Sequence, residues 1–493
     1  MKDDIKKSVT KVMIVFLFCL IALITYIAYF QAFKAPDIAA KPGNQRAWAV
    51  RNRVLRGTIY DRNNDVIAKS VREKNNVQKR VYPEGAVYAA PIGFMDSRFG
   101  GTGLEAAYDK QLTTTSNMTA SFKKLIDDPS IANLKAAFFD RKDDKDRQGN
   151  SVVTTLDNKL QKVAYNALGD DRGAVVALDP KTGNVLAMVS KPSFNPNNLA
   201  EEMKKANAGD AEHSPLLNRA IQGQYPPGST FKVVTTASAL DNIPGVQDKT
   251  FTDNGVLKFE GGGKELHNSG DASYGSLDLK KAFVVSSNVV YGTLAMDLGN
   301  DKLMKTAEGF GFNEQVPANG FIIDKSTFPK LTYSGDIARS GIGQSTVSVT
   351  PMQMALVASA VANKGVIMQP NLVSKVIDKD GTTIEVEKPK EYQRAMSEDD
   401  AATIKSYMKA LVDKNIQSGT WSYLQGTGTA GKTGTADHNL PNGQPAPPHS
   451  WFICFAPADN PKIAVAVIVE NGGYGAKKAA SVAGKVINAE LNK

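Results

Sequence analysis

Residues 451–470 read WFICFAPADNPKIAVAVIVE, two apolar runs that a short polar segment with two prolines separates. Short apolar runs bounded by turn residues are typical of buried β-strands. Residues 173–178 (GAVVAL) and 184–190 (NVLAMVS) flank a turn that reads DPKTG, so they predict a β-hairpin. Helix-forming sequence lies between these pairs, for example at 351–362, and again near 479–491. We therefore expect one α/β domain in which the first and last strands share a sheet.

The composition is that of a folded protein with more than one domain. The chain has 493 residues, of which 42% are hydrophobic and 22% charged, and its net charge is +9. At roughly 150 residues per domain this length predicts two or three domains, and the balance excludes a disordered or disulfide-stapled chain. The positive charge is spread along the sequence, so we expect no nucleic-acid partner. Two cysteines and four widely separated histidines predict no metal site.

A long apolar segment lies near the N-terminus. Residues 12–30 read VMIVFLFCLIALITYIAYF, without a charge and with Thr25 as the one polar residue. A helix of this length nearly spans a bilayer core of roughly 30 Å, whereas the apolar part of a cleavable signal peptide is usually only about 7–15 residues long. Lysines precede the segment, so the positive-inside rule places the N-terminus in the cytoplasm. We expect a cytoplasmic tail at 1–11, a transmembrane anchor at 12–33 and a single-pass protein of the cell membrane whose remaining residues are extracytoplasmic.

The sequence GTGTAGKT at residues 426–433 matches the phosphate-binding loop pattern G-x-x-x-x-G-K-[ST]. That loop requires an apolar strand before it and a helix after it. The residues that follow, GTADHNLPNGQPAPP, are too rich in glycine and proline to continue as a helix. We therefore reject nucleotide binding at this segment.

A different pattern includes the same lysine. Ser229 and Lys232 lie in YPPGSTFKVVTTASAL, where two prolines and a glycine end a loop and apolar sequence begins a helix. The two side chains are then one turn apart on one helix face. A serine hydroxyl is a poor nucleophile until a base takes its proton, and a buried lysine with a lowered pKa can be that base. Taken alone, Ser229 could equally be a helix cap.

Two further short motifs follow in order along the chain. Ser286 and Asn288 lie in KAFVVSSNVVYGTL, a polar interruption of an apolar stretch, which by itself could be a locally satisfied turn. Lys432, Thr433, Gly434 and Thr435 then precede the last two predicted strands. Each motif arises readily by chance. The ordered set S-x-x-K, S-x-N and K-T-G-T, each in a suitable context, favours one catalytic site.

This ordered set resembles that of the penicillin-binding proteins and serine β-lactamases. The remaining exported chain resembles the class B penicillin-binding proteins, most of all the actinobacterial penicillin-binding protein A type. The family pattern usually has glycine where Asn64 stands. The matching segments are RGTIYDRNNDVIA (56–68), RVYPEGAVYAAPIGF (80–94), GTGLEAAYDKQL (101–112), GIGQSTVSVTPMQMA (341–355) and AGKTGTA (430–436).

The resemblance implies both an architecture and an activity. A smaller mixed pedestal domain, of the dimerisation type, is expected at 34–150. A transpeptidase domain with the penicillin-binding and serine β-lactamase-like fold, a mainly antiparallel sheet with helices on both sides, is expected at 151–493. The implied activity is peptidoglycan D,D-transpeptidation, in which stem peptides that end in D-Ala-D-Ala are cross-linked through a serine acyl-enzyme. The resemblance also implies that β-lactams inhibit the enzyme covalently. No metal or organic cofactor is implied, and a membrane glycan polymerase of the division or elongation machinery is the implied partner.

The resemblance also assigns roles to the motif residues. Ser229 would attack the carbonyl between the two D-alanines, with Lys232 as its base. Ser286 would pass a proton to the leaving amine with help from the charge of Lys432, and Asn288 would orient Lys232 and hold the substrate amide.

The K-T-G-T segment is expected to be an edge strand that pairs with the substrate backbone. Gly434 would permit the substrate's close approach, and Thr433 and Thr435 would bind its terminal carboxylate together with Lys432. The backbone N–H groups of Ser229 and Thr435 would form the oxyanion hole.

Four other functions share parts of this pattern. A secreted β-lactamase needs neither anchor nor pedestal, and a bifunctional synthase needs a glycosyltransferase domain for which residues 34–150 are too short. A β-lactam sensor would usually couple to several membrane spans or to a cytoplasmic effector, and residues 1–11 are too short to be such an effector. A D,D-carboxypeptidase, in which water replaces the acceptor amine, remains open as the alternative.

Overall fold

The computed structural model describes residues 2–30, 34, 48, 52–73, 77–115, 130, 147–208, 214–259, 262–440 and 442–492. Its first helix, α1 (Lys2–Tyr29), contains an apolar stretch at Ser8–Tyr29 with a mean hydropathy of 2.7, none of which is buried. This helix is long and apolar enough to cross a membrane, and it therefore fits a single-pass anchor. Residues 31–33, predicted as the end of the anchor, lie outside the described residues.

The larger domain is built on a five-stranded antiparallel sheet with the order β17-β18-β19-β7-β8. Both predicted strand pairs are present, and β19 pairs with β7, so the predicted sharing of one sheet by the two ends is confirmed. Nearly every residue of these strands is buried, which explains why they appear in the sequence as continuous apolar runs. The strands are β7 (Gly173–Leu178), β8 (Val185–Lys191), β17 (Ala430–Ala436), β18 (His449–Ala456) and β19 (Ile463–Val469).

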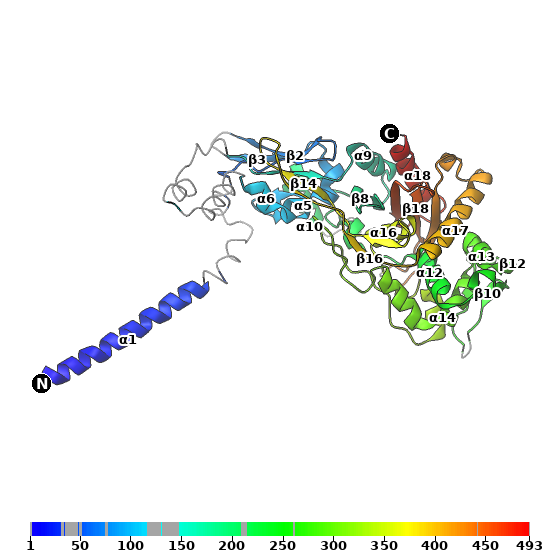
Figure 1. Ribbon diagram of the computed structural model, residues 1–493, viewed down its shortest axis with the longest axis horizontal. Helices are drawn as coiled ribbons and strands as arrows, with labels where there is room; N and C mark the ends of the chain where they lie inside the picture. The colour runs from blue at the N-terminus through cyan, green and yellow to red at the C-terminus, as the bar shows by residue number, and fades with distance from the viewer. Residues whose placement is uncertain are drawn as a thin grey trace.

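Helices cover both faces of this sheet (Figure 1). On one face, α9 (Asn158–Ala167) packs against the C-terminal helix α18 (Lys478–Leu491). On the other, α16 (Pro351–Ala362) packs against α17 (Glu398–Gln417). Helix α16 occupies the predicted range 351–362 and is buried over nearly its whole length, so it forms the centre of the core. The predicted mainly antiparallel sheet between helices is confirmed.

The N-terminal domain contains a six-stranded sheet with the order β15-β14-β6-β1-β2-β3. This sheet crosses the boundary predicted at residue 150, because β6 begins at Ser151 and β14 and β15 come from the second half of the chain. Strand β1 pairs in parallel with β6, and β14 pairs antiparallel with the other edge of β6. The strands are β1 (Ile59–Tyr60), β2 (Val66–Arg72), β3 (Gln78–Val81), β6 (Ser151–Thr154), β14 (Val373–Ile377) and β15 (Thr383–Val386).

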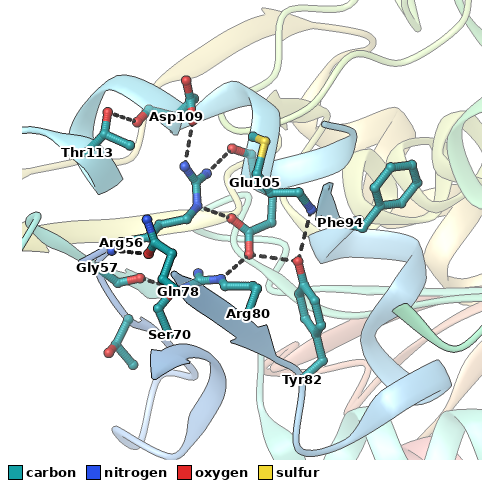
Figure 2. A network of polar contacts seen from close by, with 12 residues as sticks. Arg56, Gly57, Ser70, Gln78, Arg80, Tyr82, Phe94, Glu105, Asp109 and Thr113 are labelled. Atoms are coloured by element: carbon teal, nitrogen blue, oxygen red, sulfur yellow. Dashed lines mark hydrogen bonds and ion pairs between the residues drawn. The ribbon is translucent and has the colours of Figure 1, made fainter. Parts of the chain in front are cut away.

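A buried ionic network links three of the segments that carry the family resemblance (Figure 2). The Glu105 carboxylate accepts from Arg56 Nε at 2.7 Å, from Arg80 Nε at 2.7 Å and from the Tyr82 hydroxyl at 3.1 Å. Burial alone would raise the pKa of Glu105, but the two guanidinium groups hold that pKa below its ordinary value. Each of these three segments, 56–68, 80–94 and 101–112, contributes a side chain to the network. The three segments therefore share a structural role. Removing one partner would leave a buried charge uncompensated.

Asn64 occupies the position at which the family pattern usually has glycine. Its φ is 69°, in the left-handed region, and its N–H donates to the carbonyl of Asp61 at 3.2 Å. Asparagine adopts this conformation more readily than other non-glycine residues. The turn is therefore kept, with Asp61 Oδ1 accepting from the N–H groups of Asn63 and Asp65 at 2.7 and 2.8 Å.

Candidate active site

The three sequence motifs meet where the edge strand β17 passes the start of helix α12 (Lys232–Asn242) and the junction of helices α13 (Leu279–Val285) and α14 (Asn288–Gly309). Ser229 lies half-buried in a 3₁₀ turn (Gly228–Phe231) that leads directly into α12. Within the described part of the chain, the Ser229 hydroxyl makes no hydrogen bond. It is therefore free to contact a substrate.

Gly228 allows the turn that carries Ser229 to pack against β17. Its φ is 54°, and a Cβ added there would lie 2.5 Å from the carbonyl oxygen of Thr435. A side chain at this position would therefore be strained and would push the turn away from the strand.

The Ser286–Asn288 motif is the junction between two helices. Ser286 ends α13 in the left-handed conformation, with φ of 60° and ψ of 42°. Ser287 caps α14, because its hydroxyl oxygen accepts from the Val290 N–H at 3.0 Å. The alternative from the sequence, that the polar residues of this motif are hydrogen-bonded within a local turn, is therefore correct for Ser287. The flanking residues Ser286 and Asn288 face Lys232 instead.

Four motif residues form one hydrogen-bond network around two buried lysines. Lys232 Nζ donates to the Ser286 carbonyl at 2.7 Å, to Asn288 Oδ1 at 2.8 Å and to Ser286 Oγ at 3.2 Å. Lys432 Nζ donates to the same Ser286 Oγ at 3.0 Å. The Ser286 hydroxyl therefore bridges the two amino groups. Both lysines are fully buried, which is rare for this residue type.

The burial of these lysines changes their proton affinity. Burial lowers the pKa of Lys232 well below its ordinary value; the nearby Lys432 lowers it further, and Asp253 acts in the opposite direction. Burial also lowers the pKa of Lys432, to about 7. A lysine whose pKa is lowered in this way can be neutral near neutral pH and can accept a proton. The network can therefore move a proton between Lys232, the Ser286 hydroxyl and Lys432.

The pKa of Lys432 predicts how stability depends on pH. It is about 7 in the folded protein against an ordinary value of 10.5, so between these values the unfolded chain binds more protons and stability rises with pH. We expect Lys432→Met to reduce this rise and to increase the free energy of unfolding at neutral pH by about 1–3 kcal/mol. Denaturant titrations at several pH values measure both effects. The exposed Lys477→Met is the matched control, and an unchanged pH dependence in Lys432→Met would contradict the prediction.

The structure places the K-T-G-T residues on the edge strand β17, as predicted, and so excludes the helix that a phosphate loop requires. A Cβ at Gly434 would lie 2.9 Å from both the Pro227 carbonyl oxygen and Thr230 Cγ2. The glycine is thus required for packing β17 against the turn that carries Ser229. We had expected Gly434 to leave room for the substrate, but a side chain at this position would collide with the turn that carries Ser229.

Thr433 and Thr435 alternate with Lys432 and Gly434 along β17, so their side chains project from the opposite face of the strand. Both are half-buried, and Thr435 Oγ1 accepts from the Gly475 N–H at 3.5 Å. Within the described residues, the hydroxyl groups of the two threonines do not join the lysine network.

Two residues behind the Ser286–Asn288 junction were missed by the sequence analysis. Asp253 and Asn268 are buried and hydrogen-bond to this junction. Asp253 begins the sequence DNG, which is typical of an exposed turn, so the local pattern gave no sign of burial.

Comparison with known proteins gives consistent matches over nearly the whole chain. The family model of the penicillin binding protein transpeptidase domain matches residues 173–488, and that of the penicillin binding protein A dimerisation domain matches residues 56–130. Peptidoglycan D,D-transpeptidase PbpA of Mycolicibacterium smegmatis is 36% identical over 482 residues, 94% of each chain. PbpA of Mycobacterium tuberculosis is 35% identical over 504 residues, 98% of each chain. The penicillin G acyl-enzyme complex of penicillin-binding protein A from M. tuberculosis has a TM-score of 0.79 at 33% identity and covers 89% of this chain and 100% of that one.

Proposed function

The chain belongs to the penicillin-binding protein transpeptidase family, and on this premise we propose how its site residues carry out the reaction. It is a class B peptidoglycan D,D-transpeptidase of the serine type, which β-lactams acylate, and it has no glycosyltransferase activity. The observation that carries the residue assignment is the Ser286 hydroxyl held between Lys232 and Lys432, next to the turn that presents Ser229.

In the acylation step, Ser229 Oγ attacks the carbonyl carbon between the two D-alanines of a stem peptide, and Lys232 Nζ takes the hydroxyl proton. Two observations support Lys232 as the base: it lies one turn from Ser229, and burial lowers its pKa. The backbone N–H groups of Ser229 and Thr435 stabilise the oxyanion, and each such donor typically contributes roughly 10²–10³ in rate.

The proton then reaches the leaving group through Ser286. Lys232 Nζ donates to Ser286 Oγ, and the Ser286 hydroxyl passes its own proton to the departing D-alanine amine. Lys432 Nζ, 3.0 Å from the same oxygen, assists this transfer through its charge. Asn288 Oδ1 holds Lys232 at 2.8 Å, and the Asn288 amide nitrogen donates to the His267 carbonyl at 2.8 Å.

The edge strand β17 is proposed to bind the donor peptide. One edge of β17 pairs with β18, and in the described chain no strand pairs with its other edge. A peptide can add to such an edge by backbone hydrogen bonds. The Thr433 and Thr435 hydroxyl groups are proposed to bind the terminal carboxylate, and Lys432, whose side chain projects from the other face of β17, to attract it through its charge. The amine of a second stem peptide then attacks the acyl-enzyme, forms the cross-link and regenerates Ser229.

Anchoring at the cell membrane by α1, with both domains outside the cytoplasm, is part of the proposal. It is supported by the exposed apolar surface of α1 and by the lysines that precede its apolar stretch. A glycan polymerase of the division or elongation machinery is the proposed partner, because a transpeptidase without glycosyltransferase activity needs glycan strands that another enzyme has made.

The lifetime of the penicilloyl-enzyme tests this function. Rapid hydrolysis needs a carboxylate that activates water, as in class A β-lactamases, where it follows the S-x-N motif. Here Asp297, Asp301 and Glu308 follow that motif on α14; the two aspartates are exposed to solvent, and Glu308 is half-buried and accepts from Asn313 Nδ2 at 3.5 Å. We expect the adduct to persist for about minutes to hours, measured as the decay of a fluorescent penicillin label after excess drug is quenched. Turnover of many molecules per second would instead indicate a β-lactamase.

A further inference from the structure

A buried carboxylate lies directly behind the Ser286–Asn288 junction. Asp253, the last residue of β9 (Thr250–Asp253), is fully buried. Its carboxylate accepts from Ser287 Oγ at 2.6 Å, from Asn268 Nδ2 at 2.8 and 2.9 Å, and from the Gly255 N–H at 2.9 Å. Each of these partners donates, so the arrangement suits the ionised carboxylate.

Asn268 extends this contact to the start of helix α14. Its Oδ1 accepts from the backbone N–H groups of Asn288 at 2.7 Å and Val289 at 3.2 Å, while its Nδ2 donates to Asp253. Asp253 thus holds the junction at two points, through the Ser287 side chain and, by way of Asn268, through the backbone of Asn288. These contacts fix the residues that supply all three hydrogen-bond acceptors of Lys232 Nζ.

We propose that Asp253 is a positioning residue for acylation: through Ser287 and Asn268 it fixes the Ser286–Asn288 junction against Lys232, and its charge acts on Lys232 from behind that junction. This inference rests on the proposed function, because it assumes that Lys232 is the base for Ser229.

The charges around Lys232 give this carboxylate a specific effect. The groups that face Lys232 are Lys432 of β17, the ring of Tyr291 of α14 with its centroid 5.3 Å from Nζ, and Asp253 of β9. Burial and Lys432 both lower the pKa of Lys232, and Asp253 raises it. Asp253 therefore preserves the basicity of a lysine that burial would otherwise make a weak base.

A purely structural role would not require a charge at this position. An asparagine keeps one oxygen as the acceptor for Gly255 and Asn268, and its nitrogen can donate to Ser287 Oγ, since a hydroxyl can also accept; only the second contact of Asn268 Nδ2, 2.9 Å from Oδ2, is lost. A buried carboxylate costs more free energy to desolvate than a buried amide. A carboxylate in place of an amide is thus explained by its effect on Lys232.

The test compares full-length wild type with Asp253→Asn. Penicillin acylation rate constants are measured from about pH 5 to about pH 9, with the labelled peptide mapped in each case. We expect Asp253→Asn to be labelled at Ser229, about tenfold or more slowly, since residues in one hydrogen-bond network are coupled by about 0.5–3 kcal/mol. We also expect the acid limb of its pH profile to move to lower pH, because loss of the negative charge lowers the pKa of Lys232.

The matched control is Asp271→Asn, which removes a carboxylate of which 82% is exposed and which contacts His267. This variant should keep the wild-type rate and pH profile. A wild-type profile in Asp253→Asn, or a loss of rate that is equal at every pH, would overturn the proposal.

A second variant decides the matter if Asp253→Asn does not fold. Ser287→Ala keeps the carboxylate and removes the side-chain link to the junction, so acylation should slow about tenfold. The wild-type rate in Ser287→Ala would then overturn the positioning role. Labelling of wild type at a residue other than Ser229 is the separate result that would refute the proposed function.

Discussion

Replacing Ser229 with alanine is expected to abolish covalent labelling by fluorescent penicillin and to lower transpeptidation by about 10⁴-fold or more, since loss of the nucleophile removes the acyl-enzyme pathway. The fold should be unaffected. Ser229 is half-buried, and in the described residues its hydroxyl makes no hydrogen bond, so the free energy of unfolding should change by less than about 0.5 kcal/mol. Labelling is read from gels, and stability from thermal unfolding.

The control for this variant is Ser193→Ala. Ser193 lies in the sequence SFN, which has the same S-x-N spacing as the motif, and its hydroxyl donates to the Ala86 carbonyl at 2.8 Å. This variant should be labelled like wild type. A label on the Ser229→Ala protein would show that another residue is the nucleophile.

Replacing Lys232 with methionine is expected to slow acylation by about 10²–10⁴-fold, the usual contribution of a general base. The same change should increase stability, because a fully buried amino group is replaced by an apolar side chain. We expect the free energy of unfolding to rise by about 1 kcal/mol or more. Such a trade between stability and activity is typical of a functional site.

Stopped-flow acylation and denaturant unfolding measure the two effects of Lys232→Met. Lys281→Met is the matched control, since 69% of the Lys281 side chain is exposed on the neighbouring helix α13. It should change neither quantity. Acylation of Lys232→Met at close to the wild-type rate would place the base elsewhere.

The sequence predicted the core of the larger domain well because its strands are buried on both faces. Strands β7, β18 and β19 therefore appear as uninterrupted apolar runs, and α16 as an apolar helix. The N-terminal sheet has no such pattern in its edge strand β15 (Thr383–Val386), where every residue is exposed. For this reason the return of residues 373–386 to the N-terminal domain could not be predicted from hydropathy.

The residues of the candidate site also divide into those that a local sequence pattern predicts and those that it does not. Ser229, Lys232, Ser286 and Lys432 could be predicted because each lies in a short motif and the motifs occur in a fixed order. Asp253 contacts Ser287, 34 residues further along the chain, from a sequence that is typical of an exposed turn. A contact between residues so far apart in the chain depends on tertiary packing, so it cannot be predicted from the local sequence.

The most direct test of the proposed reaction uses a stem peptide that ends in D-Ala-D-Ala, with and without an acceptor amine. Intact mass and peptide mapping follow the protein, and chromatography follows D-alanine and the cross-linked peptide. We predict an acyl group on Ser229, release of one D-alanine for each acyl group formed, and a cross-linked product when the acceptor is present. An acyl group on another residue, or hydrolysed peptide as the sole product with acceptor in excess, would contradict the proposed transpeptidase mechanism.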